Sequence, residues 1–213
     1  MADLKKLFDA ILNGDNKTAL AITQEAIAEG VQPMDLITHH MVPAMNEVGR
    51  RFECEEYYVP ELLLSARAMK GALQQLRPLL AASGTKPLAT VVIGTVKGDL
   101  HDIGKNLVTS MLEGGGFNVI DLGTDVTPQK FVEAANSHSA NIVALSALLT
   151  VTMPMMKDTI QALKQASLRE RVKVIVGGAP VTREYADTIG ADGYSETATG
   201  AVGLARQLVA GGV

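Results

Sequence analysis

The feature that most constrains the fold is a change in the spacing of apolar residues near residue 88. Beyond it, short runs rich in Val and Ile alternate with longer stretches in which apolar residues recur at helical spacing. Strands that are apolar at every position are typical of a parallel sheet, because helices cover both of its faces. The predicted strands are Ala89–Thr95, Phe117–Leu122, Asn141–Leu145, Val172–Val176 and Ala191–Tyr194.

A helix follows each predicted strand, which indicates a doubly wound α/β domain with a five-stranded parallel sheet of the flavodoxin-like type. In the strand order 2-1-3-4-5, the loops after the first and third strands flank the topological switch point, where ligands bind. The predicted helices are Ile103–Leu112, Thr127–Asn136, Met153–Gln165, Val181–Ile189 and Ala198–Ala210.

The first part of the chain has only the helical spacing, in four amphipathic stretches separated by short turns, and this predicts a small four-helix bundle. The third stretch contains Pro43, which we expect to kink it because proline lacks the N–H of the helical hydrogen bond. We therefore predict a helical cap domain over residues 1–81, a linker of small and polar residues over 82–88, and the sheet domain over 89–213.

Composition excludes several classes of function. The formal net charge of −4 argues against a nucleic-acid binder, which usually carries a basic surplus. The absence of Trp and an aromatic content of 4% argue against a stacking platform for bases. A single cysteine excludes an internal disulfide and a zinc site built on several cysteines. Because the sequence shows neither a signal-like N-terminus nor a long apolar run, we expect a cytoplasmic protein with no membrane partner.

The loop after the first strand contains His101, which is expected at the ligand-binding edge of the sheet. Neutral imidazole is the commonest metal ligand, and its second nitrogen usually donates to a carboxylate. Asp99 and Asp102 are both near enough, and a spacing of two residues in an extended loop favours Asp99. The alternative is that His101 and Asp102 only cap the helix that follows. We expect the remaining histidines to be ordinary helix or surface residues: His39, His40 and His138.

Two further loops at this edge are made of small residues. Gly177 and Gly178 permit close approach of the backbone to something bulky. Ser146 and Thr150 add hydroxyl groups that form hydrogen bonds without filling space. Together they predict a long slot beside the sheet, although each residue taken singly is more typical of a tight strand-to-helix turn.

A phosphate-binding loop is excluded at this edge. The run from Gly98 to Gly104 and Lys105 resembles a P-loop, but five residues separate the glycines where the P-loop has four. Asn106 also replaces the Ser or Thr that holds magnesium.

Three motifs at these strand ends together resemble the signature of cobalamin-binding domains. They are Asp99-x-His101-x-x-Gly104, Ser146-x-Leu148 and Gly177-Gly178. Domains of this family have a Rossmann-like fold and hold the corrinoid "base-off", with a histidine in place of the corrinoid's own base below cobalt. The resemblance implies that the cofactor is cobalamin or a related corrinoid.

The resemblance also assigns roles to single residues. It implies that His101 is the lower axial cobalt ligand, that Asp99 is its hydrogen-bonded partner, and that Thr152 completes a catalytic relay. The implied cofactor contacts in the sheet domain are Gly98, Asp99, Leu100, His101, Asp102, Ile103, Gly104, Ser146, Leu148, Thr150, Gly177, Gly178 and Ala198.

The helical part resembles the cap of methionine synthase and of corrinoid methyl-carrier proteins. The matching runs are Val48–Phe52, Tyr58–Leu62 and Ser65–Met69. In that family, side chains of the cap cover the upper, methyl-bearing face of the corrin. The matching positions in this chain are Phe52, Val59 and Leu62.

The resemblance implies a methyl carrier that takes a methyl group on cobalt(I) from a substrate-specific methyltransferase. It would present methyl-cobalt(III) to a second methyltransferase, which uses tetrahydrofolate or a thiol as acceptor, and a reductive activase is a further implied partner. A barrel-type methyltransferase would need ~250 more residues, so we expect a carrier subunit that is not catalytic alone. The methyl donor stays open among methylamines, betaine, methanol and aryl ethers.

Other interpretations remain. The same motifs occur in the small subunit of adenosylcobalamin mutases and in cobalamin sensors, and a flavodoxin-like domain with an unrelated helical partner is the simplest alternative. The helical cap argues against a mutase, and the acidic N-terminal part argues against a DNA-binding sensor. Cys54, beside the cap motifs, is expected to be buried or neutral rather than a thiol ligand.

Overall fold

The computed structural model describes residues 2–82 and 87–211, which divide into two compact units. The first unit comprises Met1–Pro87 with the short piece Glu113–Gly116, and the second comprises Leu88–Leu112 and Phe117–Val213. The predicted linker over 82–88 falls largely on residues 83–86, which lie outside the described residues.

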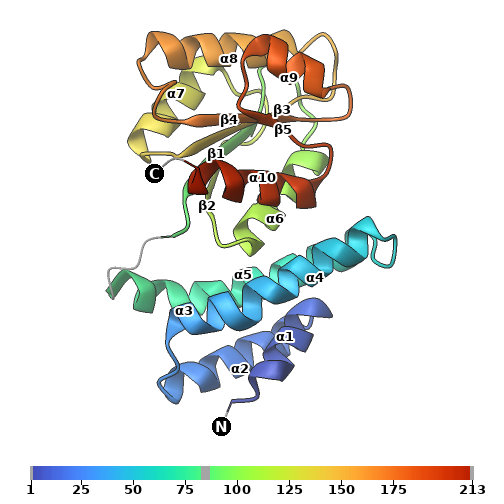
Figure 1. The fold of residues 1–213 in the computed structure, drawn as a ribbon, viewed down its shortest axis with the longest axis vertical. Coiled ribbons are helices and arrows are strands. Elements are labelled where there is room, and N and C mark those ends of the chain that lie inside the picture. The colour runs from blue at the N-terminus through green and yellow to red at the C-terminus, as the bar shows by residue number, and fades with distance from the viewer. Residues whose placement is uncertain (1, 83–86, 212–213) are drawn as a thin grey trace. The chain divides into compact units, whose positions relative to one another are not determined.

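The first unit is helical, as expected (Figure 1). Its two N-terminal helices begin at aspartates: Asp3 accepts a hydrogen bond from the amide of Lys6, and Asp15 accepts one from the amide of Thr18. The unit is held together by apolar stripes on facing helices, with α2 packed along α5. Its helical elements are α1 (Leu4–Leu12), α2 (Asn16–Ala28), α3 (Pro33–Leu36), η1 (Ile37–Met41), α4 (Val42–Glu53) and α5 (Val59–Ala82).

The predicted third helix is the continuous run of α3, η1 and α4, and its middle part is a π-helical turn. In this turn the amide of Val42 donates to the carbonyl of Ile37, five residues earlier. Pro43 stands directly after it and cannot donate a helical hydrogen bond. The disturbance expected at Pro43 is therefore found just before it, as a wider turn that frees the backbone from the proline ring.

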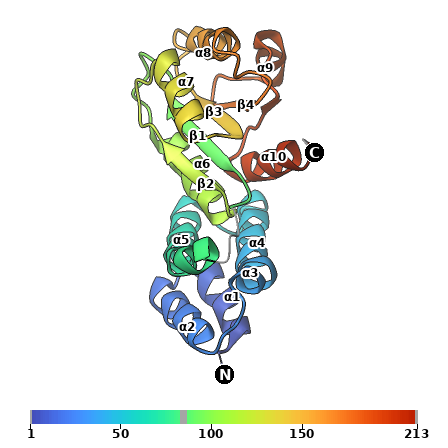
Figure 2. The same ribbon diagram turned by 90° about the vertical axis from the view of Figure 1, so that its left-hand side faces the viewer.

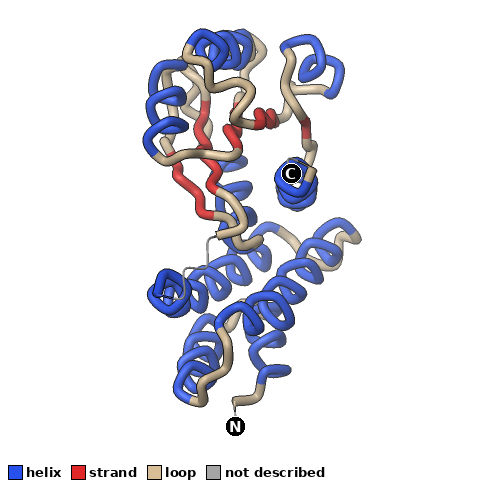
Figure 3. Tube along the Cα trace, turned by 60° about the vertical axis from the view of Figure 1, so that its left-hand side comes forward, coloured by secondary structure: helices blue, strands red, loops and turns tan. Residues whose placement is uncertain are grey.

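The second unit is a doubly wound domain with five parallel strands in the order β2-β1-β3-β4-β5. This order is the predicted one. All the strands among the described residues, drawn in red in Figure 3, lie in this unit. The strands are β1 (Thr90–Thr95), β2 (Asn118–Asp121), β3 (Ile142–Ser146), β4 (Lys173–Gly177) and β5 (Gly193–Tyr194). The helices are α6 (Ile103–Gly114), α7 (Pro128–Ser137), α8 (Pro154–Gln165), α9 (Arg183–Ile189) and α10 (Ala198–Ala210).

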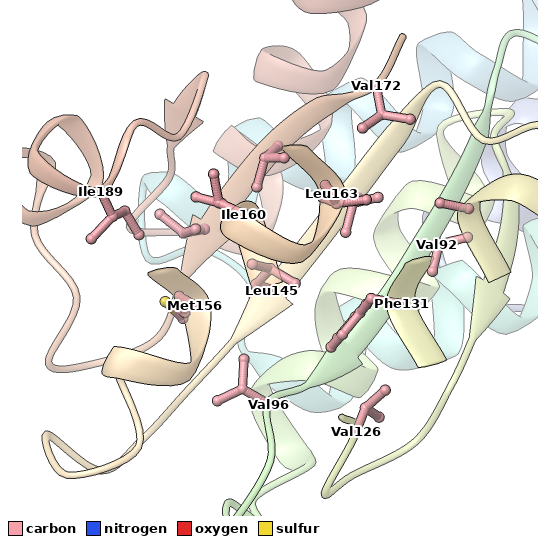
Figure 4. Close-up of a cluster of buried hydrophobic side chains, with 14 of the residues drawn as sticks. Val92, Val96, Val126, Phe131, Leu145, Met156, Ile160, Leu163, Val172 and Ile189 are labelled. Carbon is pink, nitrogen blue, oxygen red and sulfur yellow. The ribbon is translucent and has the colours of Figure 1, made fainter. Parts of the chain in front are cut away.

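The helices cover both faces of the sheet, with α7, α8 and α9 on one face and α6 and α10 on the other (Figures 1 and 2). The face toward α7 and α8 forms a dense core in which Phe131 and Met156 lie against Val92 and Leu145 (Figure 4). Alternation along the strands turns their other residues toward α6 and α10, where the candidate site lies. Among the described residues, no helix is both long and apolar enough to cross a membrane.

Candidate functional site

Three loops meet at the carboxyl edge of the sheet in the second unit. Thr95 at the end of β1 pairs with Ser146 at the end of β3, and Ser146 pairs with Gly177 at the end of β4. The chain leaves the sheet from these three adjacent positions, so the loops that follow are neighbours in space. This is the switch-point edge at which the sequence predicts a ligand.

His101 is held by Asp99 in the first of these loops. The imidazole Nδ1 lies 2.7 Å from Asp99 Oδ1. Because a carboxylate only accepts, Nδ1 carries the proton and the neutral ring has its lone pair on Nε2. The His101 side chain is 49% exposed, and its Nε2 has no hydrogen-bond partner among the described residues. Asp102 instead accepts a hydrogen bond from the side chain of Asn106, at 3.1 Å.

Asp99 is fully buried and joins two loops. Its Oδ2 accepts hydrogen bonds from the Thr152 hydroxyl at 2.7 Å and from the amides of Leu148 and Leu149 at 2.8 and 3.2 Å. Burial opposes ionisation of this carboxyl, but the hydrogen bonds from Thr152, His101 and Leu148 outweigh it and hold the pKa of Asp99 well below its usual value. Asp99 is thus an ionised acceptor that fixes the tautomer and direction of the ring.

Asp99 and the loop that contains His101 have further hydrogen-bond partners, which the sequence does not predict. The Leu148 and Leu149 amides belong to the backbone, so the residue types in the sequence do not reveal these donors. The buried hydroxyl of Thr95 donates to the carbonyl of His101 at 2.9 Å and holds the loop from the sheet side. Thr95 is the last residue of an apolar strand. A polar residue at that position is the one sequence feature that could have identified Thr95 as a partner of this loop.

A pocket of about 520 Å³ lies within the second unit, between the sheet and helices α6 and α10. Its floor is Ile93, Ala144 and Ile175, and its walls include Leu107 from α6 and Leu204 from α10. The predicted contact residues that line it are Leu100, His101, Asp102, Ile103, Gly104, Ser146, Leu148, Gly177, Gly178 and Ala198. Asp99 and Thr152 are buried beside this lining, and Gly98 and Thr150 are exposed outside it.

Two of the glycines in the lining serve the fold itself. Gly178 has a φ of +132°, and a Cβ there would lie 1.9 Å from the carbonyl oxygen of Ala147. A Cβ on Gly177 would lie 3.2 Å from the carbonyl oxygen of Ser195. The glycine pair therefore lets neighbouring loops approach closely, as the tight-turn interpretation expects.

Gly104 differs from that pair. A Cβ at Gly104 would have no protein atom within 4 Å among the described residues, and its φ is not positive. The fold does not require glycine at this position, so a bare backbone here is open to a ligand in the pocket.

The mouth of the pocket is apolar. Leu100, Ile103 and Leu148 line it and are 73%, 83% and 43% exposed. Leu149 and Val151 follow Leu148 in the same loop and are exposed as well. Large apolar side chains clustered on loops around a histidine are typical of a binding surface rather than of an ordinary solvated loop. A flat, largely apolar ligand would cover them.

The described side chains do not supply enough ligands for a metal ion by themselves. Among the described residues, no three His, Cys, Asp or Glu side chains come close enough to hold a metal ion. A metal bound through His101 would need further ligands from outside these side chains. A metal-bearing macrocycle meets this condition, and a free zinc or iron ion does not.

The predicted cap residues differ in their accessibility within the first unit. Phe52 is partly buried, Val59 is 40% exposed and its neighbour Tyr58 is 65% exposed. Leu62 is fully buried, because it lies on the inner stripe of α5 with Ala66 and Met69, so its side chain offers no surface to a ligand in this structure.

Cys54 is exposed, so of the two expectations, buried or neutral, burial is wrong. It stands at the C-terminal end of α4, in the exposed turn that leads to α5, where no apolar layer covers it.

Comparison with known proteins identifies both parts of the chain. A family model described as "B12 binding domain" matches residues 89–203, and a second model of the same description matches residues 3–77. A dimethylamine corrinoid protein of Methanosarcina barkeri is 44% identical over 209 residues, which cover 97% of each chain.

Two solved structures extend the likeness to the whole fold. A cobalamin-binding protein from Desulfitobacterium hafniense is 32% identical, with a TM-score of 0.80 over 98% of this chain and 99% of that one. A chain of the methanol:cobalamin methyltransferase complex of Methanosarcina barkeri is 30% identical, with a TM-score of 0.85 over 96% of this chain and 78% of that one.

Proposed function

Since this chain belongs to the B12-binding corrinoid proteins, we propose that it carries methyl groups between two methyltransferases on a bound corrinoid. The observation that carries this proposal is the geometry of His101, whose Nδ1 is fixed by Asp99 while Nε2 is free at the mouth of an apolar pocket. A bound corrinoid supplies a cobalt centre that takes up a methyl group and gives it away again.

His101 is the proposed axial ligand to cobalt. Its Nε2 has the lone pair that coordination needs, because Nδ1 donates to the carboxylate of Asp99. Asp99 in turn holds the ring at a fixed angle and makes it a better donor. Thr152 donates to the far oxygen of the same carboxylate at 2.7 Å and completes the proposed relay of three residues.

The pocket and its mouth fit the rest of such a ligand. The exposed Leu100, Ile103 and Leu148 offer apolar surface beside His101, which suits one face of a large ring. The 520 Å³ pocket behind them, with the bare backbone of Gly104 in its wall, has the size class of a small-molecule site and suits the nucleotide tail. Ser146 and Ala198 line the same pocket and are proposed tail contacts.

The helical unit has a proposed role at the other face of the ring. Phe52 and Val59 are the accessible members of the predicted cap set, and we assign them to excluding water from the reactive face. Such a cover also blocks methyl donors and acceptors, so transfer requires that the helical unit move relative to the sheet unit.

The proposed partners are methyltransferases. A donor-side methyltransferase is the first partner, and a methylated amine is the proposed donor class, because the curated relative is a dimethylamine corrinoid protein. The acceptor-side methyltransferase, which uses tetrahydrofolate or a thiol, and a reductive activase complete the proposed system. The chain itself is a carrier and does not catalyse transfer alone.

Anaerobic reconstitution with hydroxocobalamin tests this function. The protein is expected to retain about one corrinoid per chain through gel filtration. After reduction, it is expected to acquire radiolabel from methyl-labelled dimethylamine only when an amine-specific methyltransferase is added. A protein that stays colourless after reconstitution contradicts the proposal, as does one that binds adenosylcobalamin but not methylcobalamin.

A further inference from the structure

We propose that Asp125, in the loop between β2 and α7, is a positioning residue that holds the histidine loop in its ligand-binding shape before the corrinoid arrives. The inference rests on the proposed function, because ligation by His101 is what the loop serves. Asp125 belongs to none of the motifs that identify the family, and it does not line the pocket.

Asp125 contacts two consecutive residues of the histidine loop, one through its side chain and one through its backbone. Its Oδ1 accepts a hydrogen bond from the amide of Gly98 at 2.7 Å, and its own amide donates to the carbonyl of Asp99 at 3.0 Å. Asp99 then holds Nδ1 of His101 at 2.7 Å. The chain of contacts therefore runs from Asp125 through the Asp99 backbone to the imidazole.

The conformation of Asp125 points to the same role. Its φ is +53°, in the left-handed region that non-glycine residues seldom adopt, and Gly98 opposite it has a φ of +81°. Aspartate and asparagine tolerate this region better than other side chains, because their short polar groups hydrogen-bond locally. The Asp125 carboxylate instead bonds a distant part of the chain, the amide of Gly98. Backbone in this region persists when its surroundings over-determine it.

The loop that carries Asp125 is firmly tied to β1. The amide of Thr95 donates to the carbonyl of Gly123 at 2.9 Å, and the amide of Val126 donates to the carbonyl of Thr95 at 3.0 Å. Val96 and Val126 form an isolated parallel bridge beyond the end of the strand. Asp125 therefore sits on a rigid support, which a positioning residue needs.

A second contact anchors the same loop beyond the histidine. Asp121 accepts hydrogen bonds from the amide of Gly123 at 2.9 Å and from Lys105 Nζ at 2.5 Å. Lys105 lies in the first turn of α6, directly after the histidine loop, and its side chain is only 2% exposed. The segment that contains His101 is thus held at both of its ends, by Asp125 of the β2–α7 loop and by Asp121, the last residue of β2.

Preorganisation is the physical benefit. A loop that is ordered before the ligand arrives loses little conformational freedom on binding, so more of the contact energy appears as affinity. Removing the Asp125 carboxylate takes away the acceptor of the Gly98 amide. Two backbone bonds stay in place, one from the Asp125 amide to the Asp99 carbonyl and one from the Asp99 amide to the Val96 carbonyl. The expected result is a looser loop and a less well directed imidazole.

The test compares three variants of the full chain. Asp125→Gly removes the carboxylate but keeps a residue that adopts a positive φ readily, and Asp125→Asn keeps the acceptor oxygen. Ser139→Gly is the matched control, because Ser139 also has a positive φ, of +48°, but precedes β3 at the opposite edge of the sheet. Amide hydrogen exchange is followed by NMR in the cofactor-free protein, and hydroxocobalamin affinity and the histidine-ligated fraction are read from spectra.

Asp125→Gly is expected to speed exchange at the Gly98 amide about 10-fold, the effect of losing one charge-assisted hydrogen bond. It should also weaken corrinoid binding and lower the histidine-ligated fraction. Asp125→Asn should restore most of each loss, and Ser139→Gly should change none of them. The proposal is overturned if Gly98 exchange is unchanged in Asp125→Gly, or if exchange rises while affinity and ligation do not change. If the wild-type protein binds no corrinoid, the proposed function is wrong. The exchange rates are measured without cofactor, so they still show whether Asp125 orders the loop.

Discussion

Asp99 and His101 are joined by a 2.7 Å hydrogen bond through Nδ1, and the second oxygen of the same buried carboxylate binds the loop after β3. One side chain therefore couples the direction of the imidazole to the shape of a loop that begins on a different strand. The first two predictions test this coupling, and the others test the pocket and the metal ligand.

Replacing Asp99 by Asn should destabilise the second unit by about 2–3 kcal/mol at pH 7, because both oxygens of the carboxylate accept hydrogen bonds. In either orientation the NH2 of the new amide would face N–H donors, those of His101 or those of Leu148 and Leu149. The pKa of Asp99 is lowered in the folded state, so its contribution is present above the unfolded value near 4 and is lost as the pH falls below it. Urea unfolding at pH 7 and at lower pH measures both effects. Asp102→Asn is the control, because its carboxylate is exposed, and equal losses in the two variants would contradict the role of Asp99.

Thr152→Val should cost about 1–2 kcal/mol of unfolding free energy, since it removes a hydroxyl that donates to an ionised carboxylate. Thr152→Ser keeps that donor and should cost less than about 1 kcal/mol. The matched control is Thr159→Val. Thr159 is also buried, and its hydroxyl donates to the carbonyl of Met155 in α8. The Thr152 hydroxyl likewise lies near a backbone carbonyl, that of Leu149 at 2.8 Å, so the two sites differ in the Asp99 carboxylate. A larger loss for Thr159→Val than for Thr152→Val in denaturant unfolding would refute this ranking.

Gly104→Ala separates a ligand requirement from a folding requirement. Because a Cβ at Gly104 meets open space in the first turn of α6, the cofactor-free variant should be as stable as the wild type or up to about 1 kcal/mol more stable. Hydroxocobalamin affinity should fall at least several-fold if the ligand lies against this backbone. Thermal unfolding and an equilibrium titration check the two halves, and unchanged affinity would remove Gly104 from the site.

Gly178→Ala should differ from Gly104→Ala, because it should lower the stability of the cofactor-free protein. With a φ of +132° and only 1.9 Å available to the Ala147 carbonyl, the variant should lose roughly 2–4 kcal/mol even without a ligand. Gly177→Ala is the control, because its tightest contact is 3.2 Å and its φ is ordinary, so its loss should be clearly smaller. Equal stabilities of the two variants in urea unfolding would contradict this prediction, because the loops after β3 and β4 would then move apart to make room for the Cβ.

The strand order and the meeting of the three loops could be predicted from the sequence, because both follow from general rules for parallel sheets. The apolar run of each strand and the helix after it leave few other arrangements. The interruption at Pro43 was also predictable, since proline cannot complete the helical ladder. Its form as a π-turn over Ile37–Met41 was not, because the choice between a kink and a wider turn depends on packing with neighbouring helices.

Parts of the candidate site were not predictable, for two physical reasons. The amides of Leu148 and Leu149 and the support from Asp125 depend on backbone geometry, which leaves no pattern in residue types. Burial in the helical unit depends on which face of α5 packs inward. A shift of one residue separates the buried Leu62 from the exposed Leu63, and sequence spacing does not resolve so small a rotation.

Electron paramagnetic resonance tests directly whether the imidazole nitrogen of His101 coordinates cobalt. The protein is reconstituted with hydroxocobalamin, reduced by one electron, and its electron paramagnetic resonance spectrum is compared for natural and nitrogen-15 histidine. If His101 binds cobalt, the nitrogen splitting along the axis changes from a triplet to a doublet with the label. His101→Ala is expected to abolish this change, and His138→Ala to leave it intact. Ligation by His101 is contradicted if the splitting is the same for both forms of histidine, or if the label-dependent splitting persists in His101→Ala.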